Sequence, residues 1–485
     1  MFFNGGVSWS PDGKRLAFVR PGSEEEQIIV SDANGLNEEV VFAFGGHLRT
    51  PRWSPDGQRL AFHTIGKDSS HVIYVGGARG EPVAGSSGCR PEDFPSLIPG
   101  FDHHYSHSAA TGTRRIAVLF VDFADKAAAH TTREEDSGAL EYAETYLEAN
   151  SYGTLDIEFV PVHRWLRADQ TAEENLRLHI DHLLEADGEL TAHAAEQASG
   201  EIDFSTIDEI MVVFPSSHFG GGNTVAPVEV DGVSLPVSWV NTFPHAHPVG
   251  PQLWGGIAAH EVAHNLGLLD IYGYGYEPTP EPPPGKVWVS SRWGLMFVNV
   301  FFLVPEDHPG IAARFERPDG TTGTETYPWL APHEMLAWHR WLLGWLDESQ
   351  IKCVTDDRTT VELSAIAEPG SGTAMAAIRL DRNRVLVLES RREQGYDADV
   401  PATRIDGAIG TLPNLIEEGV LAYTVDAHPP SFRLPVRLAQ DPDGTQILDD
   451  DPILGVGESV TVAGYTITVT ADDGDAHTVS ITRDS

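Results

Sequence analysis

The apolar and polar positions of this 485-residue chain follow three patterns in succession. Near the N-terminus, short stretches of period two surround Trp-Ser-Pro-Asp-Gly turns. From residue 114, continuous apolar runs alternate with amphipathic runs of helical period, and after Cys353 the period-two stretches return. A period of two predicts strands and a period of 3.6 predicts helices. The patterns therefore indicate several structural units, as does the length, since one hydrophobic core rarely serves more than about 300 residues.

An internal repeat opens the chain. The stretch "VSWSPDGKRLAFVR" begins at residue 7 and "PRWSPDGQRLAFHT" at residue 51, which places Trp9 and Trp53 44 residues apart. Pro and Gly supply the turn dihedrals between two strands, and a period of this length with four short strands is typical of a propeller blade. The repeats resemble the TolB-type β-propeller motif. Since propellers close with about four to eight blades, two copies are either the tail of a larger propeller or a two-blade appendage, and we interpret them as a structural or docking module.

The remaining units follow from composition and periodicity. Residues 86–113 are rich in Gly, Ser, Pro and His without a period and are interpreted as a linker. In residues 114–350, predicted strands alternate with predicted helices, which indicates an α/β domain. The predicted strands are residues 114–125, 154–162 and 207–215. Helices are predicted over residues 133–153, 252–268 and 331–346, and one or two more over residues 171–198. Residues 351–485 are expected to form a β-sandwich. The predicted fold class is multidomain α+β, with two propeller-like β repeats in residues 1–85.

Charge and hydropathy narrow the classes of partner. The net charge is -40, so nucleic acid is not an expected partner, because binding phosphates requires a positive face. No run approaches 18 apolar residues, so no membrane span is expected. The N-terminus as given contains no basic segment followed by a long apolar one, so it predicts no secretory signal. Structural Ca²⁺ stays open as a cofactor, although no Asp-x-Asp-x-Asp-Gly loop with a distal Glu is present.

The chain contains two cysteines, Cys89 and Cys353. Two cysteines exclude a disulfide framework and a cysteine-rich zinc module. They are compatible with a single disulfide, if the protein is extracellular, or with two free thiols. Cys89 also precedes the α/β domain, where a thiolate that blocks a zinc site in a latent enzyme would have to lie. All three alternatives stay open.

The stretch "HEVAHNLGLLD", residues 260–270, contains the candidate chemistry. On a helix over residues 252–268, His260 and His264 lie one turn apart on one face, so both imidazoles can reach one ion. Glu261 is rotated by about 100° from His260 and can take a proton from a water molecule instead of ligating. A buried helix that merely contains two histidines is the alternative. We favour the metal site because two further residues occur at the required offsets.

Those two residues are Gly267 and Asp270. Gly267 can end the helix, since glycine tolerates the left-handed cap conformation. The chain can then reverse and bring Asp270 back as a third, oxygen ligand. Two neutral imidazoles and one carboxylate leave one open position on zinc, which is the form of a catalytic site.

The motif resembles the extended zinc motif of metzincin-type peptidases, with Asp270 where many of them have a third His. The wider pattern is similar to the immune inhibitor A-like family of secreted metallopeptidases, over about residues 114–350. The shared stretches are "VLFVDFAD" (118–125), "SYGTLDIEF" (151–159), "HEVAHNLGLLDIYG" (260–273), "WGLM" (293–296) and "AWHRWLLGWL" (337–346).

The resemblance implies a role for each matching residue. The implied zinc ligands are His260, His264 and Asp270. Glu261 matches the general base, and Met296 matches the methionine of the turn beneath the metal, which packs there without ligating. Gly294 departs from the family pattern, which has an acidic residue before Leu-Met, so the details of this turn differ.

The function implied is that of a zinc-dependent, metzincin-like endopeptidase that hydrolyses peptide bonds through a metal-activated water, with a protein or peptide as substrate. An extracellular location is expected from the resemblance. Two alternatives are an inactive peptidase-like binding protein and a zinc hydrolase of a non-protein substrate. The intact Glu261 argues against the inactive form, because a decayed site would be expected to lose its base first. The pattern specifies neither cleavage preference nor oligomeric state.

Overall fold

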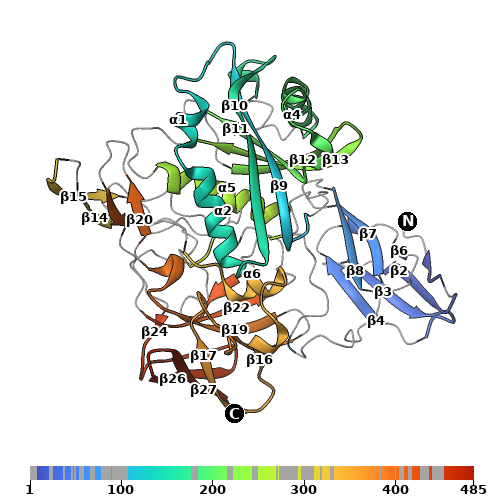
Figure 1. The fold of residues 1–485 in the computed structure, drawn as a ribbon. Coiled ribbons are helices and arrows are strands. Elements are labelled where there is room, and N and C mark those ends of the chain that lie inside the picture. Colours follow the sequence, from blue (N-terminus) through green and yellow to red (C-terminus); the bar gives the residue numbers. More distant parts are fainter. Residues whose placement is uncertain are drawn as a thin grey trace, which may run out of the picture.

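The structure is a computed structural model that describes the greater part of the chain. The described residues are 8–11, 13–20, 26–36, 39–44, 47–48, 51–53, 59–65, 71–77, 89, 108–175, 184–215, 222–242, 250–268, 271, 293–296, 311–316, 319–327, 333–381, 384–398, 400–403, 409–412, 418–426, 436–439 and 453–484. In these residues the fold is mixed α/β, with several sheets and few helices (Figure 1). Among them, no helix is long and apolar enough to cross a membrane.

The two N-terminal repeats form two small antiparallel sheets that contact one another (blue in Figure 1). The first contains β1 (Ser8–Trp9), β2 (Arg15–Arg20), β3 (Glu26–Asp32) and β4 (Glu39–Phe44), and the second contains β5 (His47–Leu48), β6 (Arg52–Trp53), β7 (Arg59–Ile65) and β8 (His71–Gly77). The indole of Trp53 donates to the Ser8 carbonyl at 3.0 Å, and the Arg15 guanidinium lies 4.4 Å from the centre of the Trp53 ring. Leu60 from the second sheet shares a small core with Ala17 and Ile28 from the first.

A five-stranded sheet forms the centre of the molecule, in the order β10-β9-β11-β13-β12. Its strands are β9 (Gly112–Phe123), β10 (Leu155–Ala168), β11 (Glu209–Phe214), β12 (Gly222–Val230) and β13 (Val233–Asn241). Only the edge strand β12 is antiparallel to its neighbour. Alternate side chains of β9 enter different cores, Val118 on one face and Leu119 on the other. A strand buried on both faces must be apolar throughout, as the pattern of residues 114–125 predicted.

Helices cover both faces of this sheet. Helices α2 (Ala139–Asn150) and α5 (Gly250–Asn265) share the core on one face, and α4 (Leu184–Ala198) packs on the other. The close approach of α2 and α5 depends on Gly255, because a Cβ atom there would lie 2.4 Å from the Ala139 carbonyl oxygen. The small residues before His260 therefore fix where α5 sits.

The predicted helix over residues 133–153 is two helices, α1 (Thr132–Asp136) and α2. The break lies at Ser137 and Gly138, whose φ angles are 46° and 92°. This conformation ends a helix, and a capping box between Thr131 and Glu134 stabilises the short first segment. The periodicity is that of a single helix because both segments bury the same face.

The chain after residue 350 forms two sheets that pack face to face. The larger contains β16 (Ile351–Cys353), β18 (Met375–Arg379), β19 (Arg384–Arg391), β22 (Gly419–Asp426), β23 (Val436–Leu438) and β24 (Ile453–Leu454), and the smaller contains β17 (Arg358–Ser364), β25 (Ser459–Val462), β26 (Tyr465–Asp472) and β27 (Ala476–Arg483). The larger sheet is buried on both faces. Leu386 of β19 contacts the core between the two sheets, whereas Val387 joins the core that contains α2 and α5.

A further sheet contains strands from both sides of residue 350. Strands β14 (Ile311–Glu316) and β15 (Thr322–Tyr327) form one sheet with β20 (Val400–Thr403) and β21 (Ile409–Leu412). Because of this pairing and the shared core, the α/β region and the C-terminal sheets pack as one continuous body. The short 3₁₀ helices are η1 (Phe204–Thr206), η2 (Glu348–Gln350) and η3 (Gly395–Asp397).

The predicted helix over residues 331–346 is wrong at both ends. Helix α6 comprises only Ala337–Leu342; residues 333–336 before it and residues 343–346 after it are not helical. The backbone N–H groups before and at the start of α6 donate to side chains of other elements: that of Met335 to Asn150 at 2.7 Å and that of Ala337 to Glu389 at 2.7 Å. These long-range partners replace the hydrogen bonds of a helical turn.

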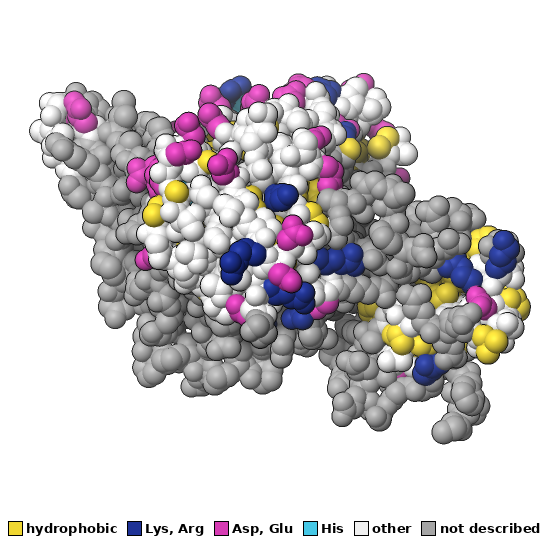
Figure 2. Space-filling view, turned by 90° about the horizontal axis from the view of Figure 1, so that it is seen from below, with side chains coloured by type: hydrophobic (Ala, Val, Ile, Leu, Met, Phe, Trp, Pro, Cys, Tyr) yellow, Lys and Arg dark blue, Asp and Glu magenta, His cyan; other side chains and the backbone are white. Residues whose placement is uncertain are grey.

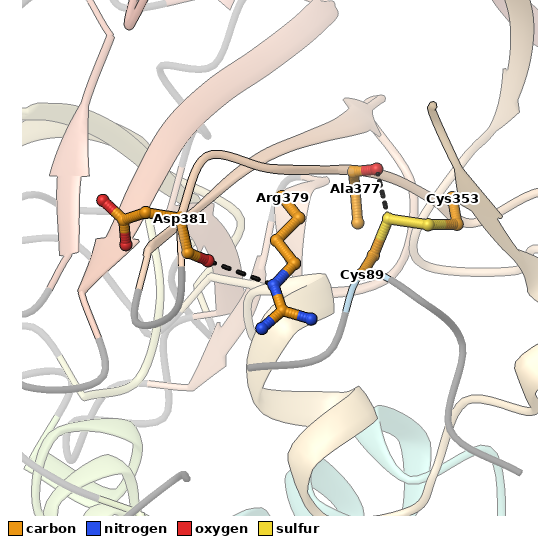
Figure 3. The surroundings of a disulfide bond; sticks show 5 residues. All are labelled: Cys89, Cys353, Ala377, Arg379 and Asp381. Atoms are coloured by element: carbon orange, nitrogen blue, oxygen red, sulfur yellow. Dashed lines mark hydrogen bonds between the residues drawn. A yellow bond between two sulfur atoms is a disulfide. The ribbon is translucent and has the colours of Figure 1, made fainter. Parts of the chain in front are cut away.

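Cys89 and Cys353 form a disulfide, with 5.6 Å between their Cα atoms (Figure 3). The Cys89 sulfur lies in the main core, 3.0 Å from the Ala377 carbonyl oxygen of β18. The bond ties the segment before the central sheet to β16. Of the alternatives left open by the sequence, the structure has the disulfide, so neither sulfur is available as a zinc ligand in this state.

Candidate metal centre

Helix α5 holds the two histidines of the motif and ends where the sequence predicted. Gly267 has a φ of 104°, and the Leu268 N–H turns back to the Ala263 carbonyl at 3.0 Å. Tryptophan, alanine and valine side chains of α5 are buried against α2 and the central sheet. The helix is therefore held rigidly by packing, and the partly buried His260 and His264 lie on one face of it.

The outer nitrogens of the two imidazoles face each other. The Nε2 atoms of His260 and His264 are 3.1 Å apart. Each inner nitrogen lies 2.9 Å from a backbone carbonyl oxygen: Nδ1 of His260 from Leu295, and Nδ1 of His264 from Leu268. Both rings are therefore fixed in orientation by the backbone.

These contacts determine where the protons are. A carbonyl oxygen only accepts, so each Nδ1 must carry a hydrogen and donate it. A neutral imidazole then has a lone pair on Nε2. Two lone pairs at this distance repel one another, and a cation between them removes the repulsion. In histidine metal sites the ring nitrogen away from the metal donates to a carbonyl or carboxylate in the same way.

The separation also fits zinc. In a tetrahedral site with zinc–nitrogen distances of about 2.0–2.1 Å, two coordinating nitrogens lie about 3.3 Å apart. The observed 3.1 Å requires only a small adjustment. The residues present therefore suit a zinc ion held by two Nε2 atoms.

Glu261 completes the one group of potential metal ligands found among the described residues. Its carboxylate and the two histidine nitrogens all lie within 4.8 Å of one another, and its side chain is buried. From there it can ligate a cation or exchange a proton with a small molecule bound beside it. Asp270, the third ligand expected from the sequence, lies outside the described residues.

The turn expected beneath the site lies next to it. Met296 and Leu295 are fully buried, and Leu295 is the residue whose carbonyl orients His260. The Met296 carbonyl accepts from the Ile271 N–H at 3.1 Å, which ties the turn to the chain just beyond the motif. Gly294, where the family pattern has an acidic residue, is within this buried turn.

A buried carboxyl below the helix was missed by the sequence analysis. Glu209 of β11 accepts from the Asn265 amide at 2.7 Å and from the Ser238 hydroxyl at 3.2 Å. Burial raises its pKa to about 8; these hydrogen bonds oppose the rise, and Glu261 adds to it. The sequence contains no clear signal for this burial, because Glu209 directly follows Asp208 at the start of the apolar run "EIMVVF".

His339 of α6 is a second group that the site's surroundings perturb. Its side chain is buried, and burial, followed by the proximity of His260, lowers its pKa to about 3. It is therefore neutral at physiological pH.

No family model matches this chain, and no curated protein does. Among solved structures, TolB from Acinetobacter baumannii is 26% identical over 16% of this chain and 19% of its own, with a TM-score of 0.14. The β-propeller domain of the Trilobed protease from Pyrococcus furiosus is 18% identical over 19% of this chain and 38% of its own, with a TM-score of 0.12. The chain spans well under half of either structure, and likenesses this weak support no argument about fold or function.

Proposed function

We propose that this protein is a zinc-dependent endopeptidase of the metzincin type, related to the immune inhibitor A-like family. One observation carries the proposal. Two imidazoles of one helix hold their Nε2 atoms 3.1 Å apart, while each Nδ1 atom lies 2.9 Å from a backbone carbonyl oxygen. This arrangement is built for a cation, and the adjacent Glu261 supplies a base.

His260 and His264 would hold the zinc ion, together with Asp270. When bound, zinc lowers the pKa of a coordinated water and polarises a carbonyl group. The helix orients both imidazoles in advance, so little conformational entropy is lost when the ion binds. The buried turn at Leu295 keeps His260 in the required tautomer.

Glu261 moves the proton. Its carboxylate accepts a proton from the attacking water and then delivers it to the nitrogen of the leaving amine. The side chain is buried, and its carboxylate lies within 4.8 Å of the histidine nitrogens. A glutamine at this position would keep the size and polarity but could not accept the proton.

The disulfide supports the proposed export of the protein. Such bonds persist in oxidising compartments and are rare in the cytosol. The bond between Cys89 and Cys353 joins parts of the chain 264 residues apart. A crosslink that closes so long a loop stabilises the fold by restricting the unfolded chain. A secreted peptidase acts among other proteases, where such a constraint limits local unfolding.

The test uses the full-length chain. Zinc content is measured on the same sample that is assayed for cleavage of casein, with and without a chelator. We expect about one zinc per chain, cleavage that the chelator abolishes, and recovery when zinc is restored. Zinc binding without cleavage of any protein or peptide would favour a zinc hydrolase of another substrate. A chain that binds no zinc would contradict the proposal.

A further inference from the structure

We infer that Arg391, from the C-terminal sheet, is a positioning residue for the metal centre, acting through the turn that orients His260. The inference rests on the proposed zinc site. Arg391 is the last residue of β19 and is fully buried. It lies far from the motif in sequence, and its connection to the site runs through backbone carbonyl groups.

The first link is between Arg391 and the turn. One terminal nitrogen of Arg391 donates to the Trp293 carbonyl at 3.3 Å, and the guanidinium lies 5.4 Å from the centre of the Trp293 ring. Trp293 is two residues before Leu295, whose carbonyl accepts from Nδ1 of His260. A displacement of this turn would therefore move the acceptor that sets the tautomer and rotation of His260.

The second link fixes Arg391 itself. Its Nε lies 2.9 Å from an Asp397 oxygen, and its Nη1 donates to Glu389 at 3.0 Å. Both terminal nitrogens also donate to the Glu334 carbonyl, at 3.1 and 3.0 Å. The planar guanidinium makes these hydrogen bonds through its terminal nitrogens and the ion pair with Asp397 at the same time, which a lysine cannot.

These residues belong to an ionic cluster, which we define as Glu334, Arg340, Glu389, Arg391 and Asp397; all of them are buried. Arg340 is the second cation of the cluster. It pairs with the Glu334 carboxylate and donates to Asn150 at 2.7 Å and to the Ile366 carbonyl at 2.7 Å. No contact of Arg340 with the turn at residues 293–296 is found among the described residues. Arg391 and Arg340 thus share burial and charge partners but differ in contact with the turn.

Because only Arg391 of this pair contacts the turn among the described residues, Arg340 serves as its matched control. Full-length Arg391→Lys and Arg340→Lys are compared with the wild-type chain for zinc affinity, by competition with a chromophoric chelator, and for the visible spectrum of bound Co²⁺. Both changes weaken the ionic cluster, and denaturant unfolding reports how much. We expect Arg391→Lys to weaken zinc binding by about 10-fold or more, the usual scale for a group that orients a metal ligand. Arg340→Lys should leave both the affinity and the Co²⁺ spectrum close to wild type.

Equal affinities in the two variants, whether both reduced or both unchanged, would overturn the inference. If either lysine variant fails to fold, Asp397→Asn and Glu334→Gln replace them. The first weakens the anchor of Arg391 and the second that of Arg340, and only Asp397→Asn should lower zinc affinity. Wild-type protein that binds no zinc would instead refute the proposed function.

Discussion

A buried ionic cluster and a partly buried histidine pair lie close together in this molecule and differ in how their polar groups are partnered. In the ionic cluster, two guanidinium groups face three carboxylates, and their terminal nitrogens also donate to backbone carbonyls. In the histidine pair, two groups of the same kind face one another, and their inner nitrogens are already occupied by carbonyls. The ionic cluster contains charges of both signs, whereas the histidine pair brings two nitrogens of the same kind together.

The comparison separates structural from binding roles without reference to conservation. A buried ion pair costs several kcal/mol to desolvate, and only internal partners repay it. The ionic cluster meets that condition and joins α6 to β19. For the histidine pair, whose Nε2 atoms are 3.1 Å apart, we propose that the counter-charge is the zinc ion. The two regions meet at Trp293, where Arg391 reaches the turn beneath the histidines.

The largest effect is expected from a change that removes proton transfer at the histidine site and leaves metal binding intact. Glu261→Gln should keep zinc near one per chain and reduce peptide hydrolysis by at least about 10²-fold, the usual scale for a lost general base. Zinc content and initial cleavage rate are measured on the same sample. Glu189→Gln, an exposed change on α4, is the matched control and should cleave normally. A Glu261→Gln variant that binds zinc and retains its activity would reject Glu261 as the base.

The second prediction asks whether a carboxylate completes the histidine site. Asp270→Ala should weaken zinc binding by at least about 10-fold and lower activity with it, because two imidazoles alone hold zinc poorly. Chelator competition gives the affinity. Glu277→Ala serves as the comparison, since Glu277 is the next carboxylate along the chain. Unchanged affinity in Asp270→Ala together with weakened affinity in Glu277→Ala would assign the third ligand to Glu277.

The sequence predicted those features of the site that depend on one helix alone. The spacing of His260 and His264 and the stop at Gly267 depend on one helix and its cap, and the structure has both. The carbonyls that orient the imidazoles could not be predicted in this way. Leu268 is close in sequence, but Leu295 is brought to His260 by the tertiary fold. Arg391 had no local signal, because its partners lie on elements that the sequence does not place together.

The fold shows the same division. Apolar runs predicted the strands of the central sheet, since burial on both faces leaves a pattern in the strand itself. The segment before α6 was assigned to a helix because its periodicity is helical, yet Asn150, Glu389 and Asp397 capture its N–H groups. These three acceptors come from α2, β19 and η3. A pattern along one segment contains no information about such competitors.

The third prediction concerns Glu209. It belongs neither to the ionic cluster nor to the histidine pair, because its partners are a neutral amide and a neutral hydroxyl. Burial raises its pKa to about 8 from an ordinary value of 4.5. Between these values the unfolded chain has lost the proton while the folded chain retains it, so this group lowers the free energy of unfolding as pH rises. Each pKa unit of difference is worth about 1.4 kcal/mol. Glu209→Gln removes the titration and should be stabilised relative to wild type by at least about 1 kcal/mol more at pH 8 than at pH 5.

Denaturant unfolding of both chains at the two pH values measures this difference. The glutamine can still accept from Asn265, so the comparison changes the titration and leaves the packing nearly intact. A difference in unfolding free energy that is the same at pH 5 and pH 8 would show that Glu209 does not titrate in this range.

The smallest effect is expected from removing the N-terminal repeats. Their small core is separate from the one that contains α5 and the turn at Met296. Their exposed apolar side chains, Trp9 and Leu36 at 58% and 63% exposure, lie on the repeats themselves, and Figure 2 shows hydrophobic groups over this part of the surface. Neither the histidine pair nor the ionic cluster has a contact with the repeats among the described residues. The zinc site should therefore not depend on them.

A chain that begins at Ser86 retains Cys89 and its disulfide. We expect it to fold, bind zinc and cleave peptides at a rate within about twofold of wild type, since the main core stays complete. A matched chain that begins at Arg90 and contains Cys353→Ser lacks the disulfide as well, and should unfold about 2–5 kcal/mol more easily. Comparing the two separates the tether from the repeats. If the longer chain is folded and loaded with zinc but no longer cleaves peptides, the repeats contribute to binding of the substrate, and the appendage interpretation is wrong.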